Sequence, residues 1–253
     1  MAQSAHPVPN RTLTEWHSPH TRTDAISDLI HGVDRYNPTN LSEMEDYLSA
    51  QLRAGEHDLL ANLAILKLYQ FNPQLSNPDV IVNILLKSLS ATVHGPDFNL
   101  CLSLLREPIN ILHDIDSDDQ SFVIMVPFIQ KLHELIRTCQ FTTFWKEFNS
   151  STDVASRIHG VYLPQQPHLL TDLRHLFATS IASCFSRIPL VRIQRWLDLP
   201  QSELGDWCAG VGWQVEGEMA VIPKNGDNDV KAGVVKETVE LNQLTKLVAA
   251  AAY

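Results

Sequence analysis

Residues 58–73 read DLLANLAILKLYQFNP, and this stretch decides the fold. It contains no glycine, and no proline before Pro73, while Leu, Ala, Lys and Gln all favour helix, so it predicts a helix of about three to four turns. Its apolar side chains lie around most of the helix circumference, which is typical of a helix buried on several sides. Asp58 is placed to cap the N-terminus, and Asn72 ends the helix because a residue before proline disfavours the α conformation. We therefore expect a central core helix.

The composition and charge limit the classes of function. The chain has 253 residues, of which 44% are hydrophobic and 19% charged, which is enough for one or two soluble globular domains. Its 29 acidic and 19 basic residues give a net charge of −10, which disfavours general binding to nucleic-acid phosphates. The N-terminal segment lacks the apolar run of a secretion signal, and no stretch approaches the ~18 apolar residues of a membrane span. The sequence predicts a cytoplasmic protein with no membrane partner.

The four cysteines are Cys101, Cys139, Cys184 and Cys208, and they form no C-x-x-C pair. Each lies in an apolar segment with helical spacing. We therefore expect four reduced, mostly buried thiols, as is usual for a protein in a reducing compartment.

Residues 24–150 predict a series of helices joined by short polar turns. Besides the central helix, apolar residues recur at helical spacing over 24–31, 42–54, 78–92, 97–105 and 121–138. Ser42 to Glu45 match a capping box. Asp97 is placed to cap the segment 97–105. Pro127 predicts a kink or a later start in the segment 121–138. Helices joined in this way pack as antiparallel hairpins, so we expect a mainly α, HEAT-like helical repeat domain without an exact sequence repeat.

An aromatic stripe follows this series, and an acidic loop interrupts it. The stripe has the i, i+3, i+4, i+7 spacing of one helix face, which is more often core than a cofactor site, and consists of Phe141, Phe144, Trp145 and Phe148. Residues 114–119 read DIDSDD and predict a solvated loop. Residues 1–23 are rich in Pro, His, Ser and Thr and predict a mobile tail.

The pattern changes after a stretch at 151–169 that contains Gly160, Pro164 and Pro167 and that we expect to be a linker. Three helical segments lie at 171–185, 191–199 and 202–210, and short apolar runs at 213–215 and 219–222 flank the turn Glu216-Gly217-Glu218. Three helices followed by a β-hairpin are the outline of a winged helix, which we place at 170–240.

The last segment, 241–253, predicts a C-terminal helix with an apolar stripe formed by Leu241, Leu244, Leu247 and Val248. Such a stripe either docks a partner or packs on its own domain, and the sequence leaves both open. The four residues are the partner-binding candidates.

Catalytic motifs are missing from the sequence. It contains no phosphate-binding G-x-x-x-x-G-K-[ST], no G-x-S-x-G and no H-E-x-x-H, and Gly210-x-Gly212 lacks the third glycine of a dinucleotide loop. The pair His17-x-x-His20 supplies two ligands, whereas a structural zinc needs about four. We predict no enzyme activity, and no catalytic, cofactor-binding or metal-binding residues. An unrecognised hydrolase stays as an alternative that a deep pocket would support.

The winged helix raises nucleic-acid binding as a second alternative. Recognition helices of this kind carry Arg, Lys, Asn or Gln, but the segment 202–210 carries Glu203 and Asp206 and no basic residue. Three basic and five acidic residues lie between 187 and 222. Direct nucleic-acid binding is therefore disfavoured, although Arg192 and Arg195 could contact RNA at one edge. A solvated helix face is the commoner role for such a pair.

Several strings in the chain resemble one family. They are GVDRYNP at 32–38, DLLANLAILKLYQFNP at 58–73, ILLK at 84–87, PDF at 96–98, Thr138-Cys139 with Phe144-Trp145, and QRWL at 194–197. With helical repeats followed by a winged helix, the chain resembles the PCI-domain scaffold subunits of the proteasome lid, the signalosome and eukaryotic translation initiation factor 3, and within that group the initiation-factor branch. The resemblance runs from about residue 24 to the C-terminus. The chain departs from the family in its longer tail, at 114–119 and near Pro164.

The resemblance implies a non-catalytic scaffold without a cofactor, which supports translation initiation on the small ribosomal subunit through protein contacts. Its partners would be other subunits of the initiation factor complex, subunit l foremost, and the small ribosomal subunit indirectly. Its C-terminal helix would join a bundle of such helices. The alternatives are a subunit of a sibling assembly, the proteasome lid or the signalosome, and an RNA-binding winged-helix protein.

Overall fold

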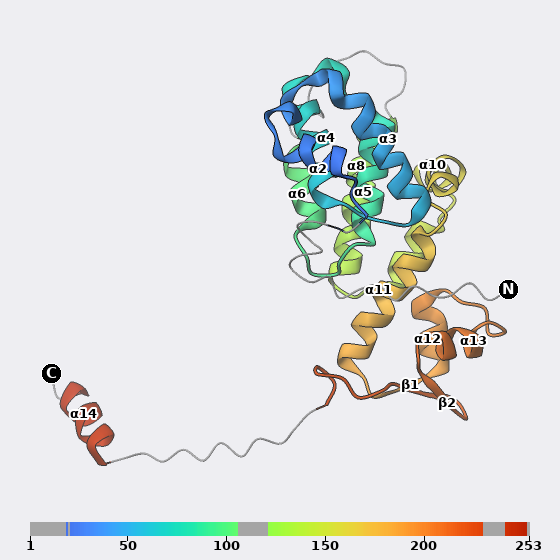
Figure 1. Cartoon of the computed structure of the whole chain (residues 1–253). Coiled ribbons are helices and arrows are strands. Elements are labelled where there is room, and N and C mark those ends of the chain that lie inside the picture. The colour runs from blue at the N-terminus through green and yellow to red at the C-terminus, as the bar shows by residue number, and fades with distance from the viewer. Residues whose placement is uncertain (1–18, 20, 106–120, 230–240, 252–253) are drawn as a thin grey trace.

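A computed structural model of the chain describes residues 19, 21–105, 121–229 and 241–251, and most of these residues are helical (Figure 1). The strands are β1 (Arg187–Pro189), β2 (Gln214–Glu216) and β3 (Met219–Val221). The α-helices are α2 (Asp24–His31), α3 (Leu41–Ala54), α4 (Leu59–Phe71), α5 (Pro78–Leu89), α6 (Asp97–Ser103), α8 (Ser121–Arg137), α9 (Phe141–Phe148), α10 (Asp153–Arg157), α11 (Leu169–Cys184), α12 (Leu190–Leu197), α13 (Leu204–Gly210) and α14 (Leu241–Ala251). The mainly α fold with a small β element is confirmed.

The central helix α4 is confirmed at both ends. Asp58 caps it by accepting a hydrogen bond from the Ala61 amide at 3.1 Å, and the helix ends at Phe71, directly before Asn72. Ile65 and Leu66 are fully buried, and α4 contacts α2, α3, α5 and α6. A helix surrounded in this way needs apolar side chains on most of its circumference, as the sequence indicated.

Two local predictions in the helical part are wrong, and a third is wrong in one of its two alternatives. The capping box at Ser42 is not formed, because α3 already begins at Leu41, directly after the short 3-10 helix η2 (Pro38–Asn40). Asp97 is the first residue of α6 rather than its cap, and its Oδ2 lies within hydrogen-bond distance of Nε2 of the buried His57 side chain, at 3.2 Å. Of the two outcomes expected for Pro127, the later start is not found, because α8 begins at Ser121 and contains the proline; a kink stays a prediction. The acidic loop at 114–119 lies outside the described residues.

The segment expected to be a linker at 151–169 is helical over much of its length. It contains α10, the π-helical turn η4 (Ile158–Tyr162) and the 3-10 turn η5 (Leu163–Gln165). Ile158 is buried, and the Tyr162 hydroxyl donates to Asp79 Oδ1 at 2.6 Å. Pro164 favoured a linker in the sequence, but it occupies the first turn of η5, where a proline costs no hydrogen bond. The division into domains stays a prediction.

The C-terminal part has the topology of a winged helix, in the order α11, β1, α12, α13, β2, β3. The strand order is β1-β3-β2, both pairs are antiparallel, and Gly217 adopts a positive φ of 60° in the turn between β2 and β3. The sequence predicted the hairpin but missed β1. This strand has three residues with a proline at the end, and only Ile188 is buried.

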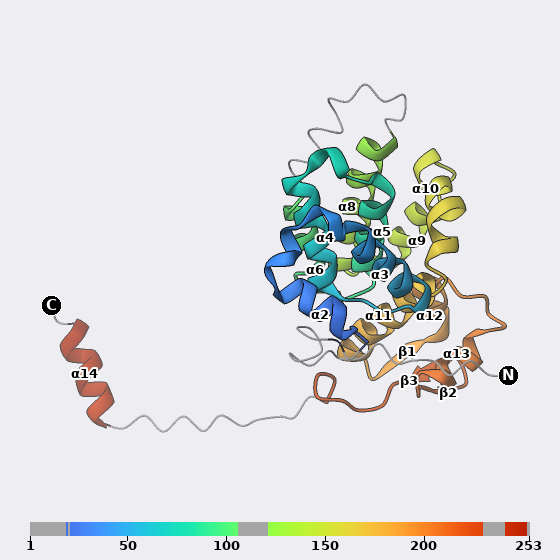
Figure 2. The same cartoon turned by 45° about the horizontal axis from the view of Figure 1, so that its top comes forward.

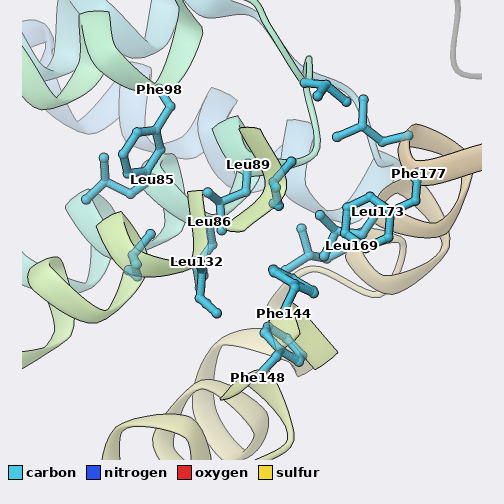
Figure 3. Close-up of a cluster of buried hydrophobic side chains, with 14 of the residues drawn as sticks. Leu85, Leu86, Leu89, Phe98, Leu132, Phe144, Phe148, Leu169, Leu173 and Phe177 are labelled. Atoms are coloured by element: carbon cyan, nitrogen blue, oxygen red, sulfur yellow. The ribbon is translucent and has the colours of Figure 1, made fainter. Parts of the chain in front are cut away.

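One continuous core joins the two parts. Figure 3 shows side chains of α5, α6, α8, α9 and α11 in one cluster, among them Leu86, Leu132, Phe144, Leu173 and Phe177. The aromatic stripe of α9 belongs to this core, as expected from its spacing. Helix α11 begins in the core and runs on to the winged helix in both views (Figures 1 and 2), so the two parts share one rigid element.

Arg22 and Thr23, directly before α2, form hydrogen bonds that hold them against the helical part. The Arg22 guanidinium donates two hydrogen bonds to Asp58, from Nε to Oδ2 at 2.6 Å and from Nη2 to Oδ1 at 2.7 Å. The two side chains are 2% and 1% exposed. The expectation of a mobile tail is therefore wrong at residues 22 and 23, since Thr23 also caps α2. Residues 1–18 and 20 lie outside the described part of the chain, and His17 and His20 with them.

We expect Arg22→Ala to lower the free energy of unfolding by about 3–5 kcal/mol, because it leaves the buried Asp58 carboxylate without its cation. Urea unfolding followed by circular dichroism measures the loss. Arg53→Ala is the matched control, since Arg53 is exposed and its loss is expected to cost about 0.5 kcal/mol or less. Equal losses of unfolding free energy in the two variants would show that the buried Arg22–Asp58 pair stabilises the fold no more than an exposed arginine does.

Candidate protein-binding surfaces

The face of the winged helix that reads DNA in other proteins is acidic in this chain. Helix α13 carries no Lys or Arg, and Glu203 and Asp206 at its start are exposed. Glu218 is exposed in the turn between β2 and β3, and Glu216 at the end of β2 is also exposed but pairs with Arg187 at 2.7 Å. Both elements that would approach a phosphate backbone thus present carboxylates, which repel it.

Arg192 and Arg195 lie on the outer side of α12, where both are exposed, while Ile193 and Leu197 of the same helix are buried. Within the described chain neither guanidinium takes part in an ion pair. The pair is therefore free to contact a partner. Contact with RNA at this position stays a prediction.

Strand β2 is an edge of the sheet. Its three residues are all exposed, and Val215 is 44% exposed. An edge strand carries backbone N–H and C=O groups that a strand of another chain can pair with. The sequence did not predict this surface. The hairpin alone does not show which of its strands is an edge, because that depends on β1, which pairs with β3 and leaves β2 outermost.

Helix α14 lies apart from the rest of the chain in both views (Figures 1 and 2). Leu244 is 47% exposed and Val248 is 67% exposed. Leu241 and Leu247 belong to the same helix at the spacing of one face. The structure therefore shows no packing of Leu244 and Val248 on the protein's own core, and docking of this stripe on a partner stays a prediction.

The described chain offers little that supports catalysis. A hollow of about 480 Å³ lies over Lys224, Asn225, Gly226 and Asp229, and it is open and contains no His or Cys. No group of three potential metal ligands gathers in the described ranges. None of the helices in these ranges combines the length and apolar character needed to cross a bilayer.

The cysteines are free, but the expectation of mostly buried thiols is only half right. Cys101 and Cys208 are buried, whereas Cys139 and Cys184 are exposed at helix ends. Burial raises the pKa of the Cys101 thiol to about 12, and burial also raises the pKa of Cys208. A raised thiol pKa opposes formation of the nucleophilic thiolate.

Comparison with known proteins identifies relatives over nearly the whole chain. The sequence model of the CSN8/PSMD8/EIF3K family matches residues 75–233. The chain is 63% identical to "Eukaryotic translation initiation factor 3 subunit K" of Cryptococcus neoformans var. neoformans serotype D, over 97% of this chain and 98% of that protein. It is 36% identical to the protein of the same name from Mycosarcoma maydis over 95% of both chains. For Phaeosphaeria nodorum the identity is 32%, over 90% of this chain and 93% of that protein.

We expect no retarded band in a mobility-shift assay with single-stranded RNA at physiological salt and protein concentrations up to about 1 µM, because α13 and the β2–β3 turn are acidic. A shift that disappears in Arg192→Glu plus Arg195→Glu would instead favour the RNA-binding alternative. The control is Arg53→Glu plus Lys146→Glu, which changes the net charge equally at two exposed positions outside the winged helix.

Proposed function

The chain belongs to the CSN8/PSMD8/EIF3K family, and we propose that it is a non-catalytic scaffold subunit of eukaryotic translation initiation factor 3. The observation that carries the proposal is the 63% identity to a protein with the name of that subunit, over 97% of this chain. The match covers both the helical part and the winged helix.

The architecture supports a scaffold role. A scaffold must hold separate binding surfaces at fixed distances, and α11 does so by contributing to the core of the helical part and to the winged helix. Hydrogen bonds add to this rigidity, because Lys87 Nζ donates to Asp172 Oδ2 of α11 at 2.9 Å and to the Gly55 carbonyl at 2.8 Å. The edge strand β2 and helix α14 are then the surfaces left for neighbouring proteins.

The partners in this proposal are other subunits of the initiation factor, subunit l foremost, with the small ribosomal subunit contacted through them. The work would take place in the cytoplasm, where translation initiates. The acidic α13 and the acidic turn between β2 and β3 favour protein partners over RNA. The family description also includes subunits named CSN8 and PSMD8, so the signalosome and the proteasome lid are the sibling assemblies to test against.

Affinity purification of the tagged full-length chain, followed by mass spectrometry, tests the proposal. We expect initiation factor 3 subunits and small-subunit ribosomal proteins to co-purify, because a scaffold subunit is recovered with its assembly. Tag alone is the control. Recovery of lid or signalosome subunits in their place, or of the chain alone with a measurable hydrolase turnover, would overturn it.

A narrower prediction concerns the stripe on α14. We expect Leu244→Asp plus Val248→Asp to abolish co-purification of partner subunits while the melting temperature of the isolated chain stays within about 1 °C, because both side chains are exposed. Lys246→Asp is the matched control, since it changes the charge of the same helix by the same amount on the opposite side. A large fall in melting temperature would assign α14 to the protein's own core instead.

A further inference from the structure

Outside these surfaces, the helical part exposes a pair of aromatic rings. We call Val33, Tyr36 and Phe71 the aromatic patch. Tyr36 belongs to the one-turn 3-10 helix η1 (Val33–Tyr36) and Phe71 is the last residue of α4, and their rings meet edge to face with centroids 6.0 Å apart. Val33 lies three residues before Tyr36, and residues three apart in a 3-10 helix share a side.

These three side chains lie outside the buried core of the fold. Val33 is 85% exposed, Tyr36 48% and Phe71 58%, whereas Leu68 and Tyr69 on the same turn of α4 are buried. Contact between exposed apolar groups from two separate elements is the kind of feature that marks a binding surface, in contrast to apolar residues that are exposed singly.

Each ring of the patch carries a cation over its face. The Arg35 guanidinium carbon lies 4.6 Å from the centre of the Tyr36 ring, and Lys67 Nζ lies 4.7 Å from the centre of the Phe71 ring. In the part of the chain that the structure describes, neither cation forms an ion pair; Lys67 Nζ donates to Gln70 Oε1 at 2.7 Å instead. In a protein with a net charge of −10, two cations without carboxylate partners are available to a ligand.

In the described ranges, acids on the adjoining elements form no ion pair with Arg35 or Lys67. Asp34 precedes Arg35 in η1, but consecutive side chains of a 3-10 helix point about 120° apart. Glu45 of α3 accepts the hydrogen bond of the Tyr69 hydroxyl. Acids farther away are screened beyond about 8 Å at physiological salt. The patch therefore combines apolar contact area with two local positive charges.

We propose that the aromatic patch docks an acidic segment of another protein, in which Asp or Glu residues flank an apolar or aromatic side chain. The apolar side chain packs on Val33, Tyr36 and Phe71, and the flanking carboxylates pair with Arg35 and Lys67. Charge complementarity selects such a segment over a neutral or basic one. Single-stranded RNA fits less well, because one face of each ring is already covered by a cation and cannot stack on a base.

Photo-crosslinking of the full-length chain in its own cells tests the proposal. The amino acid p-benzoylphenylalanine is placed at position 71, the cells are irradiated, and the crosslinked segment is sequenced by mass spectrometry. A synthetic peptide of that segment is then titrated calorimetrically against the isolated chain. We expect acidic residues on both sides of an apolar one, and binding that weakens about tenfold or more in Arg35→Glu plus Lys67→Glu.

The control is again Arg53→Glu plus Lys146→Glu, with the same net charge and with its substitutions on α3 and α9, and it should bind the peptide as the natural chain does. Melting temperatures verify that all variants fold. The proposal is overturned by crosslinks to RNA, to a second copy of this chain or to a neutral or basic segment, by no crosslink, or by equal weakening in the two charge-reversal pairs. The proposal does not depend on which assembly the chain joins, because the experiment identifies the amino-acid sequence of the docked segment and not the complex it comes from.

Discussion

A negative charge buried at the start of α4 constrains the N-terminal third of the structure. The Asp58 carboxylate is 1% exposed and accepts hydrogen bonds from Arg22, from the Ala61 amide and from the Tyr47 hydroxyl. Burial, then the charge of Asp58, raises the pKa of Tyr47, which keeps that hydroxyl protonated as a donor. A buried carboxylate without such partners is strongly unfavourable, so the segment before α2, helix α3 and helix α4 must assemble together around it.

A second set of buried polar contacts fixes the register between the helical part and the start of α11. The Gln166 amide donates to the Asn83 carbonyl at 3.2 Å and to Asn83 Oδ1 at 2.9 Å, and Asn83 Nδ2 donates to Gln165 Oε1 at 2.9 Å. Apolar packing alone tolerates small shifts between helices, whereas these directional amide contacts favour one arrangement, in which Gln166 Oε1 has no hydrogen-bond partner among the described residues. This is why the two parts can behave as one body.

The sequence predicted elements whose cause is local and missed those whose cause is tertiary. The cap and end of α4 follow from Asp58 and Pro73 and were found. The helical turns at 153–165 were missed because Gly160 and Pro164 usually break helices, and here buried Ile158 and Tyr162 hold the segment in place. The exposed edge of β2 depends on pairing with a strand distant in sequence. Of the candidate binding surfaces, only the α14 stripe and the Arg192–Arg195 pair could be predicted from residue spacing.

The carboxylates on α13 and around the turn between β2 and β3 have a consequence for how the winged helix meets polyanions. Ribosomal and messenger RNA form a dense field of phosphates, and a winged helix with the usual basic residues would adhere to it at random. Glu203, Asp206 and Glu218 place negative charge on this face, and Glu216 pairs with Arg187 at 2.7 Å, so the face opposes the close approach of polyanions. A module with the topology of a nucleic-acid reader thereby presents a face whose charge favours neutral or basic protein surfaces over RNA.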